Sequence, residues 1–208
     1  MSSTNIFSYE NKLLAILGAT FGFVFMDRLA LAYLFPFMAP ELKLTNSDLG
    51  MLSAVLSLMW AVSSLTSGVY SDLRGRRKTL LLLAVVSFSA CSALSGLVTG
   101  FLSLFVFRGL IGFAEGPVLP LCQSLMVESS TPRRRGLNMG IVQGGSVGLL
   151  AGILGPPLIV GLASAYGWRH AFYVSCVPGL LAALFIWKTV REVPPGGSSQ
   201  LVKERLLQ

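Results

Sequence analysis

The sequence predicts an all-α membrane protein with six transmembrane helices. Of its 208 residues, 53% are hydrophobic and 12% are charged, whereas a soluble domain carries about 25% charged residues. The charged residues gather in short loops between apolar runs of about 18 residues or more, the length that crosses a bilayer as a helix. These loops leave no room for a soluble domain. The predicted spans are residues 12–38, 47–70, 79–99, 101–127, 137–163 and 169–188.

Positive charge lies on one side of this arrangement, between spans 2 and 3, between spans 4 and 5, and after span 6. The opposite side holds only Lys43 and Arg169. This is the positive-inside pattern, and it explains the net charge of +7 without nucleic-acid binding. It predicts a cytoplasmic lead at 1–11, a six-span bundle at 12–190 and a cytoplasmic linker or tail at 191–208. Both termini are expected in the cytoplasm, with the bundle in the inner or plasma membrane of the cell.

Prolines and polar residues mark the ends of the first two spans. Span 1 is expected to end at Pro36 and Pro40, because proline removes a helical hydrogen bond. A polar turn at 44–48 follows, in which Thr45 or Ser47 is a candidate cap for span 2. Span 2 is rich in serine and other small residues, and small residues allow membrane helices to approach closely.

Span 5 carries a stripe of glycines. Gly140, Gly144, Gly148 and Gly152 recur every four residues and therefore share one face of a helix. We expect this face to pack closely against another helix. The sequence Gly155-Pro156-Pro157 is then expected to interrupt the span.

Four ionisable residues lie in the middle of apolar spans: Asp27 and Arg28 in the first, Arg108 and Glu115 in the fourth. A charge at that depth costs at least about 2.5–3.5 kcal/mol on insertion scales, so such residues usually face a cavity and are functional. Two arginines and two carboxylates form a balanced set. The set predicts an anion site beside a site that binds a proton.

Helix geometry limits how these four residues meet. Asp27 and Arg28 are neighbours and point about 100° apart, so one can face a cavity while the other faces a neighbouring helix. Arg108 and Glu115 lie on nearly the same face but about 10 Å apart along the axis, too far for a tight ion pair. Each is expected to meet another helix, water or a ligand. The structural alternative is an ion pair between helices, Asp27 with Arg108 or Arg28 with Glu115.

The turn after span 2 carries a recognisable spacing of glycine, aspartate and arginine. It contains Gly68, Asp72, Gly75, Arg76 and Arg77, and it resembles the cytoplasmic loop motif of the major facilitator superfamily. The match departs from that motif at position 73, which is leucine instead of arginine. The resemblance implies that these residues stabilise one conformer by pairing across two halves of a transporter; topology-setting charge is the alternative. Glu128 is expected to pair with the basic run 133–135 or to face solvent.

The intramembrane residues resemble the anion:cation symporter branch of that superfamily. The match rests on Met26-Asp27-Arg28 and on Arg108, Glu115-Gly116 and Pro120. The resemblance implies that Asp27 and Glu115 couple transport to protons and that Arg28 and Arg108 act on the substrate anion. Relatives often have tyrosine where this chain has Phe25, so one hydroxyl group is missing.

The resemblance implies the N-terminal half of a twelve-helix fold, built from two inverted three-helix repeats. A second six-helix bundle, either a C-terminal half or another chain, would complete it. The expected function is secondary active, proton-coupled symport of a small organic anion such as a sugar acid or another carboxylate. The alternatives are a half that does not transport and serves assembly or regulation, and a drug-type proton antiporter.

Polar residues within the spans add one open question, and the remaining classes of function find no support. Gln123, Asn138 and Gln143 are expected either to line the cavity or to join helices. The sequence has no nucleophile–base pattern, metal-ligand cluster or nucleotide-binding loop, so it predicts no enzyme, no metal and no cofactor.

Overall fold

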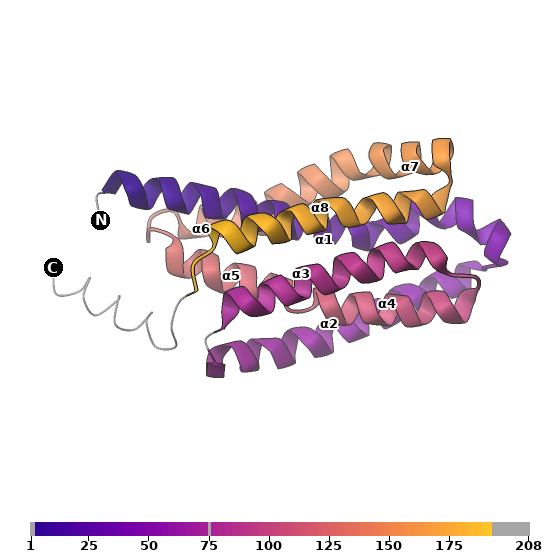
Figure 1. Ribbon diagram of the computed structural model, residues 1–208, viewed down its shortest axis with the longest axis horizontal. Coiled ribbons are helices and arrows are strands. Elements are labelled where there is room, and N and C mark those ends of the chain that lie inside the picture. The colour runs from indigo at the N-terminus through magenta and orange to yellow at the C-terminus, as the bar shows by residue number, and fades with distance from the viewer. Residues whose placement is uncertain (1–2, 75, 193–208) are drawn as a thin grey trace.

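The computed structural model describes residues 3–74 and 76–192 of the chain. These residues form a bundle of long helices (Figure 1). The helices are α1 (Ser3–Leu42), α2 (Asn46–Arg74), α3 (Arg77–Leu94), η1 (Ser95–Leu97), α4 (Phe101–Glu115), α5 (Val118–Ser129), α6 (Arg135–Gly140), η2 (Ile141–Gly145), η3 (Val147–Leu154), α7 (Gly155–Tyr166) and α8 (Trp168–Thr189).

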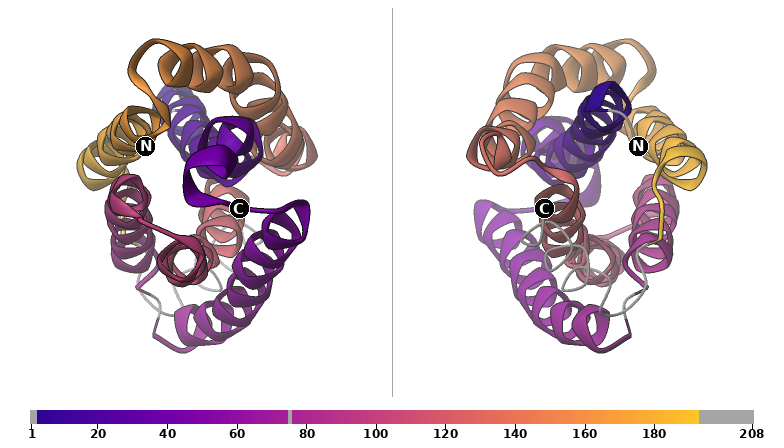
Figure 2. Two further views of the ribbon diagram at one scale, coloured as in Figure 1. Left: turned by 90° about the vertical axis from the view of Figure 1, so that its right-hand side faces the viewer. Right: turned by 90° about the vertical axis from the view of Figure 1, so that its left-hand side faces the viewer.

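Six helical stretches of the described chain are long and apolar enough to cross a membrane, which confirms the predicted number. They are Tyr9–Leu42, Asn46–Ser71, Arg77–Leu97, Phe101–Ser129, Arg135–Tyr166 and Trp168–Thr189. α1 begins and α8 ends at the same end of the bundle (Figure 1), as an even number of spans requires. α2 ends and α3 begins at that end too, so the basic residues that flank them lie there. Seen end-on, α2 and the fifth span lie on opposite sides of the bundle (Figure 2).

Span 1 extends past the prolines that were expected to end it. Pro36 and Pro40 lie inside α1, which continues to Leu42. The prediction was wrong because the two prolines are four residues apart, so the carbonyl group of Pro36 is the one that Pro40 leaves without an N–H. Both lost hydrogen bonds therefore fall on one exposed side of the helix end.

Spans 4 and 5 depart from regular α-helix. Span 4 is divided at Gly116 and Pro117, directly after Glu115, because Pro117 cannot donate the next helical hydrogen bond. Span 5 contains two π-helical segments, η2 and η3. The predicted interruption at residues 155–157 is wrong. The helix continues there and changes from π- to α-helix. Pro156 and Pro157 occupy the first turn of α7, where a missing N–H group is tolerated.

Glycines of α4 bring it into close contact with α2. A Cβ atom at Gly112 would overlap the backbone carbonyl group of Leu56, and one at Gly116 would lie 2.7 Å from both the Trp60 carbonyl oxygen and the Ser63 Cβ. Small residues thus set the α2–α4 distance, as expected for membrane helices. The glycine stripe of span 5 behaves differently. Its residues are exposed, and nothing in the described chain packs on that face within ordinary contact distance.

We expect Gly112→Ala to destabilise the bundle by about 1–3 kcal/mol, because the new methyl group must displace backbone atoms of α2. Thermal unfolding in detergent would measure the effect, at about 2–4 °C per kcal/mol for a protein of this size. Gly148→Ala is the matched control, since a Cβ atom there meets open space. Equal stability of the two variants would contradict the close contact.

Two apolar clusters form the core and meet at mid-depth. One contains Leu17, Phe88 and Leu125, and the other contains Leu34, Leu104 and Phe172. Along α1 the first cluster ends at Val24 and the second begins at Met26. Asp27 therefore lies where the two clusters meet, and Arg108 and Glu115 lie between the corresponding residues of span 4.

Candidate functional site

Asp27 faces the interior of the bundle, where α1 packs against α3 and α8. Its side chain is 2% exposed. The Oδ1 atom accepts hydrogen bonds from the hydroxyl groups of Ser92 and, at 3.2 Å, Ser175. The two serine hydroxyls also lie 2.9 Å from each other. The other carboxylate oxygen, Oδ2, has no hydrogen-bond partner among the described residues.

Arg28 points the other way, into a cavity of about 470 Å³. Its Nη2 donates a hydrogen bond of 2.8 Å to the Ser57 hydroxyl. Its guanidinium carbon lies 5.8 Å from the ring centre of Phe25 and 5.4 Å from that of Trp60. The divergence of two neighbouring residues, one toward a helix and one toward a cavity, confirms the expectation from helix geometry. The cavity is lined by Phe21, Phe25, Arg28, Trp60, Leu119 and Gln143.

Arg108 and Glu115 are fully buried inside the bundle. The Arg108 guanidinium lies 5.3 Å from the ring centre of Phe172 on α8. None of its three nitrogen atoms, and neither carboxyl oxygen of Glu115, has a hydrogen-bond partner in the described chain. Arg108 is close enough to both Asp27 and Glu115 for their charges to interact with its own.

Arg108 and Glu115 share one face of span 4. That face packs inward, while the opposite face, with Leu102, Val106 and Leu110, is exposed. Of the four charged residues, only Arg28 has a partly exposed side chain.

The structural alternative for the four residues was an ion pair between helices. Within the part of the chain that the structure describes, no nitrogen–oxygen contact of 4.0 Å or less joins any two of Asp27, Arg28, Arg108 and Glu115. The charges interact across longer distances instead.

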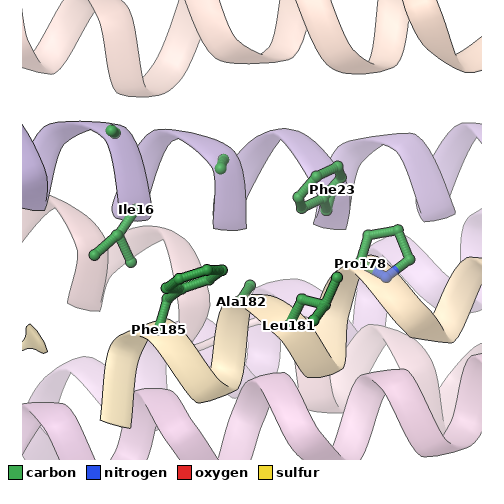
Figure 3. A pocket seen from close by; sticks show the side chains of 8 residues that line it. Ile16, Phe23, Pro178, Leu181, Ala182 and Phe185 are labelled. Carbon is green, nitrogen blue, oxygen red and sulfur yellow. The ribbon is translucent and has the colours of Figure 1, made fainter. Parts of the chain in front are cut away.

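A second cavity, of about 420 Å³, lies between α1 and α8 (Figure 3). Its lining side chains are all apolar and include Phe23, Pro178 and Phe185. A cavity of this kind offers an anion no hydrogen-bond donor and no positive charge. The cavity at Arg28 is therefore the candidate site.

The turn between α2 and α3 is described only in part. Gly68 lies in α2 with open space around it, and Arg76 is exposed. Gly75 and the side chain of Asp72 lie outside the described residues, so the motif as a whole stays a prediction. Arg77 forms an ion pair with Glu128. Glu128 was expected to meet the basic run 133–135 or solvent, and this was wrong because the start of α3 lies beside the end of α5.

Sequence reasoning left several partners of the site unidentified. Ser92 and Ser175, which bond Asp27, and Trp60, beside Arg28, gave no signal, because serine and tryptophan are ordinary residues of membrane helices. Of the polar residues expected either to line the cavity or to join helices, Gln143 and Asn138 each take one role. Gln143 lines the cavity, whereas the Asn138 amide joins helices by donating hydrogen bonds of 2.6 Å to Glu10 and 2.8 Å to Ser130.

Comparisons with known proteins agree with this architecture. The family model of the Major Facilitator Superfamily matches residues 17–206. The hexuronate transporter of Bacillus subtilis (strain 168) is 30% identical over 170 residues, which are 82% of this chain and 40% of that protein. The probable sulfoacetate transporter SauU of Cupriavidus necator is 26% identical over 165 residues, 79% of this chain and 38% of that protein. The chain thus spans about two fifths of the length of these relatives.

A solved structure gives the same fold. A bacterial homologue of the human lysosomal transporter Spinster, in an inward-facing and occupied conformation, superposes with a TM-score of 0.79 at 23% identity. The superposition covers 92% of this chain and 46% of that one. The chain belongs to the Major Facilitator Superfamily, a family of membrane transporters and not of enzymes, and its six spans correspond to half of such a transporter.

Proposed function

We propose that this bundle takes part in proton-coupled symport of a small organic anion, together with a second six-helix bundle. The observation that carries the proposal is the arrangement of the four charges. Arg28 opens into a cavity, and Asp27, Arg108 and Glu115 lie buried behind it. Relatives named for hexuronate and sulfoacetate transport support an anionic substrate.

Charge balance gives the coupling a physical basis. Two arginines and two carboxylates sum to zero, and a buried net charge is costly in a low-dielectric interior. An anion at Arg28 adds one negative charge, and a proton on a carboxylate adds one positive charge. Binding both together restores the balance, so each favours the other.

Glu115 is the carboxylate best placed to take that proton. It interacts electrostatically with Arg28 and with Arg108, and neither of its oxygens has a partner among the described residues. A negatively charged Glu115 attracts the positive charge of Arg28, which would otherwise attract the substrate anion. Once protonated, it leaves Arg28 to the substrate.

Asp27 and Arg108 complete the set in supporting roles. Asp27 already accepts two hydrogen bonds and is the second proton-coupling candidate. Arg108 was predicted to bind the substrate anion, but it does not line the cavity in this conformation. We assign it to holding the two carboxylates in balance, with a contact to the anion left to other conformations of the transport cycle.

The remaining elements of the proposal concern orientation and gating. Both termini of the chain are assigned to the cytoplasm by the excess of basic residues at that end of the bundle, and the bundle is assigned to the inner or plasma membrane of the cell. The turn with Gly68, Asp72, Gly75, Arg76 and Arg77 is assigned to stabilising one conformer through contacts with the second bundle. The Arg77–Glu128 ion pair anchors that turn to span 4.

Uptake into proteoliposomes tests the proposed function. A panel of radiolabelled carboxylates would be offered with an inward proton gradient to the transporter that contains this bundle. We expect accumulation of at least one carboxylate above equilibrium, abolished by a protonophore. Uptake of cationic drugs, and of no anion, would support the antiporter alternative, which a cavity-facing arginine disfavours by repelling a cation. No uptake of any compound would support the other alternative, a six-helix half that serves assembly or regulation and does not transport.

A further inference from the structure

The wall around Arg28 is mainly aromatic and aliphatic. Phe21, Phe25, Trp60 and Leu119 supply four of its six side chains, and Arg28 and Gln143 supply the other two. Phe21 and Phe25 also pack edge to face, with ring centres 5.4 Å apart. Three rings from two helices, α1 and α2, therefore share one wall with a single cationic group.

The polar groups of this wall are almost all donors. Arg28 has five N–H donors, and the described chain uses only the bond to Ser57. The Trp60 indole N–H and the Gln143 amide group add further donors. The side-chain carbonyl of Gln143 is the single acceptor among the six lining side chains. A carboxylate has only acceptors and fits this wall, whereas each hydroxyl group of a ligand also brings a hydrogen that needs an acceptor.

The position of the Arg28 guanidinium determines where the rest of a bound carboxylate lies. Phe25 and Trp60 flank Arg28 at 5.8 and 5.4 Å, so a carboxylate bound to Arg28 places the carbon next to it beside the two rings. A flat apolar body can lie on those rings in offset or edge-to-face contact. Several hydroxyl groups placed there would share one side-chain acceptor, that of Gln143, so most of their O–H donors would lose water without gaining a hydrogen bond from this wall, which is costly.

We infer that the anion held by this wall has a flat, apolar body with few hydroxyl groups, as in an aromatic monocarboxylate, and that Trp60 selects it. This inference rests on the proposed anion site at Arg28. It specifies the substrate class, which the proposed function leaves open between sugar acids and other carboxylates. It applies to the side of the anion that faces this bundle, whatever covers the other side.

Equilibrium binding to the transporter that contains this bundle, in lipid nanodiscs, tests the inference, with radiolabelled benzoate and gluconate as probes. We expect benzoate to bind at least about tenfold more tightly than gluconate, since a wall with a single acceptor disfavours a ligand with several hydroxyl groups. Trp60→Leu should weaken benzoate by about fivefold or more and leave gluconate within about twofold. Trp60→Phe keeps a ring and should retain most benzoate binding. Trp187→Leu is the control, because Trp187 is exposed and outside the cavity.

The outcomes separate this inference from the proposed function. If gluconate binds as tightly as benzoate or more tightly, and Arg28→Gln removes it, the inference is wrong and the anion site stands. If Trp60→Leu and Trp60→Phe weaken both probes equally, Trp60 is structural and does not select the body. If neither carboxylate binds, or if Arg28→Gln changes nothing, the anion site itself is wrong, and the inference fails with it.

Discussion

Replacing Glu115 with glutamine is expected to abolish proton-driven accumulation of the anion while leaving anion exchange in place. Glutamine keeps the size and polarity of the side chain but cannot gain or lose a proton. Because Glu115 is fully buried, its change of charge is felt at Arg28 with little screening by solvent. Accumulation against a gradient should fall to the equilibrium level, a loss of at least about tenfold.

The measurement compares two assays on the same proteoliposomes. Uptake driven by a pH gradient reports coupling, and counterflow of labelled against unlabelled anion reports binding and conformational exchange without net proton movement. Glu192→Gln is the matched control, because Glu192 is exposed and its carboxylate contacts only Lys78 and Thr79 in the described chain. Undiminished accumulation in Glu115→Gln would assign the proton to another group, with Asp27 the next candidate.

Replacing Arg28 with glutamine is expected to weaken anion binding by about 30-fold or more. Removing one partner of a charge-assisted, partly desolvated pair costs about 2–5 kcal/mol. Lysine should restore part of the loss, because it returns the charge without the planar fork that bonds a carboxylate with two N–H groups. The graded order of arginine, lysine and glutamine distinguishes binding of the anion from a purely structural role.

Anion affinity of the three proteins would be measured in nanodiscs at one pH and one salt concentration. Arg133→Gln is the control, since Arg133 is exposed and lies outside the cavity lining, so its loss removes the same charge away from the site. An equal, small effect of Arg28→Gln and Arg133→Gln would indicate attraction by overall charge only. A loss of affinity in Arg28→Lys as large as in Arg28→Gln would instead point to a packing defect.

The spans could be predicted from the sequence because the bilayer imposes length and composition directly. The divergence of Asp27 and Arg28 was also predictable, since it follows from 100° per residue along one helix. What could not be predicted was the face of span 4 that turns inward. Its exposed residues Leu102, Val106 and Leu110 are as apolar as its buried Leu104 and Ile111, because lipid and protein interior are similar solvents.

The cavity was beyond sequence reasoning for a related reason. Its lining combines residues far apart in the chain, from Phe21 on α1 to Gln143 in η2, and only the packing of the helices brings them together. Trp60 and Leu119 are ordinary apolar residues until they lie beside a charged group. Arg28 and Gln143 carried a usable signal, because a charged or polar side chain within a span needs a partner or a cavity.

Anion affinity as a function of pH, in the wild-type protein and in Glu115→Gln, tests most directly the claim that anion and proton bind together. The account predicts that the wild-type protein binds the anion about 5- to 150-fold more tightly at low pH than at high pH, the usual range of coupling between two sites. Glu115→Gln should bind with nearly constant affinity across the same range. A wild-type affinity that does not change with pH, or an unchanged pH dependence in Glu115→Gln, would contradict the account.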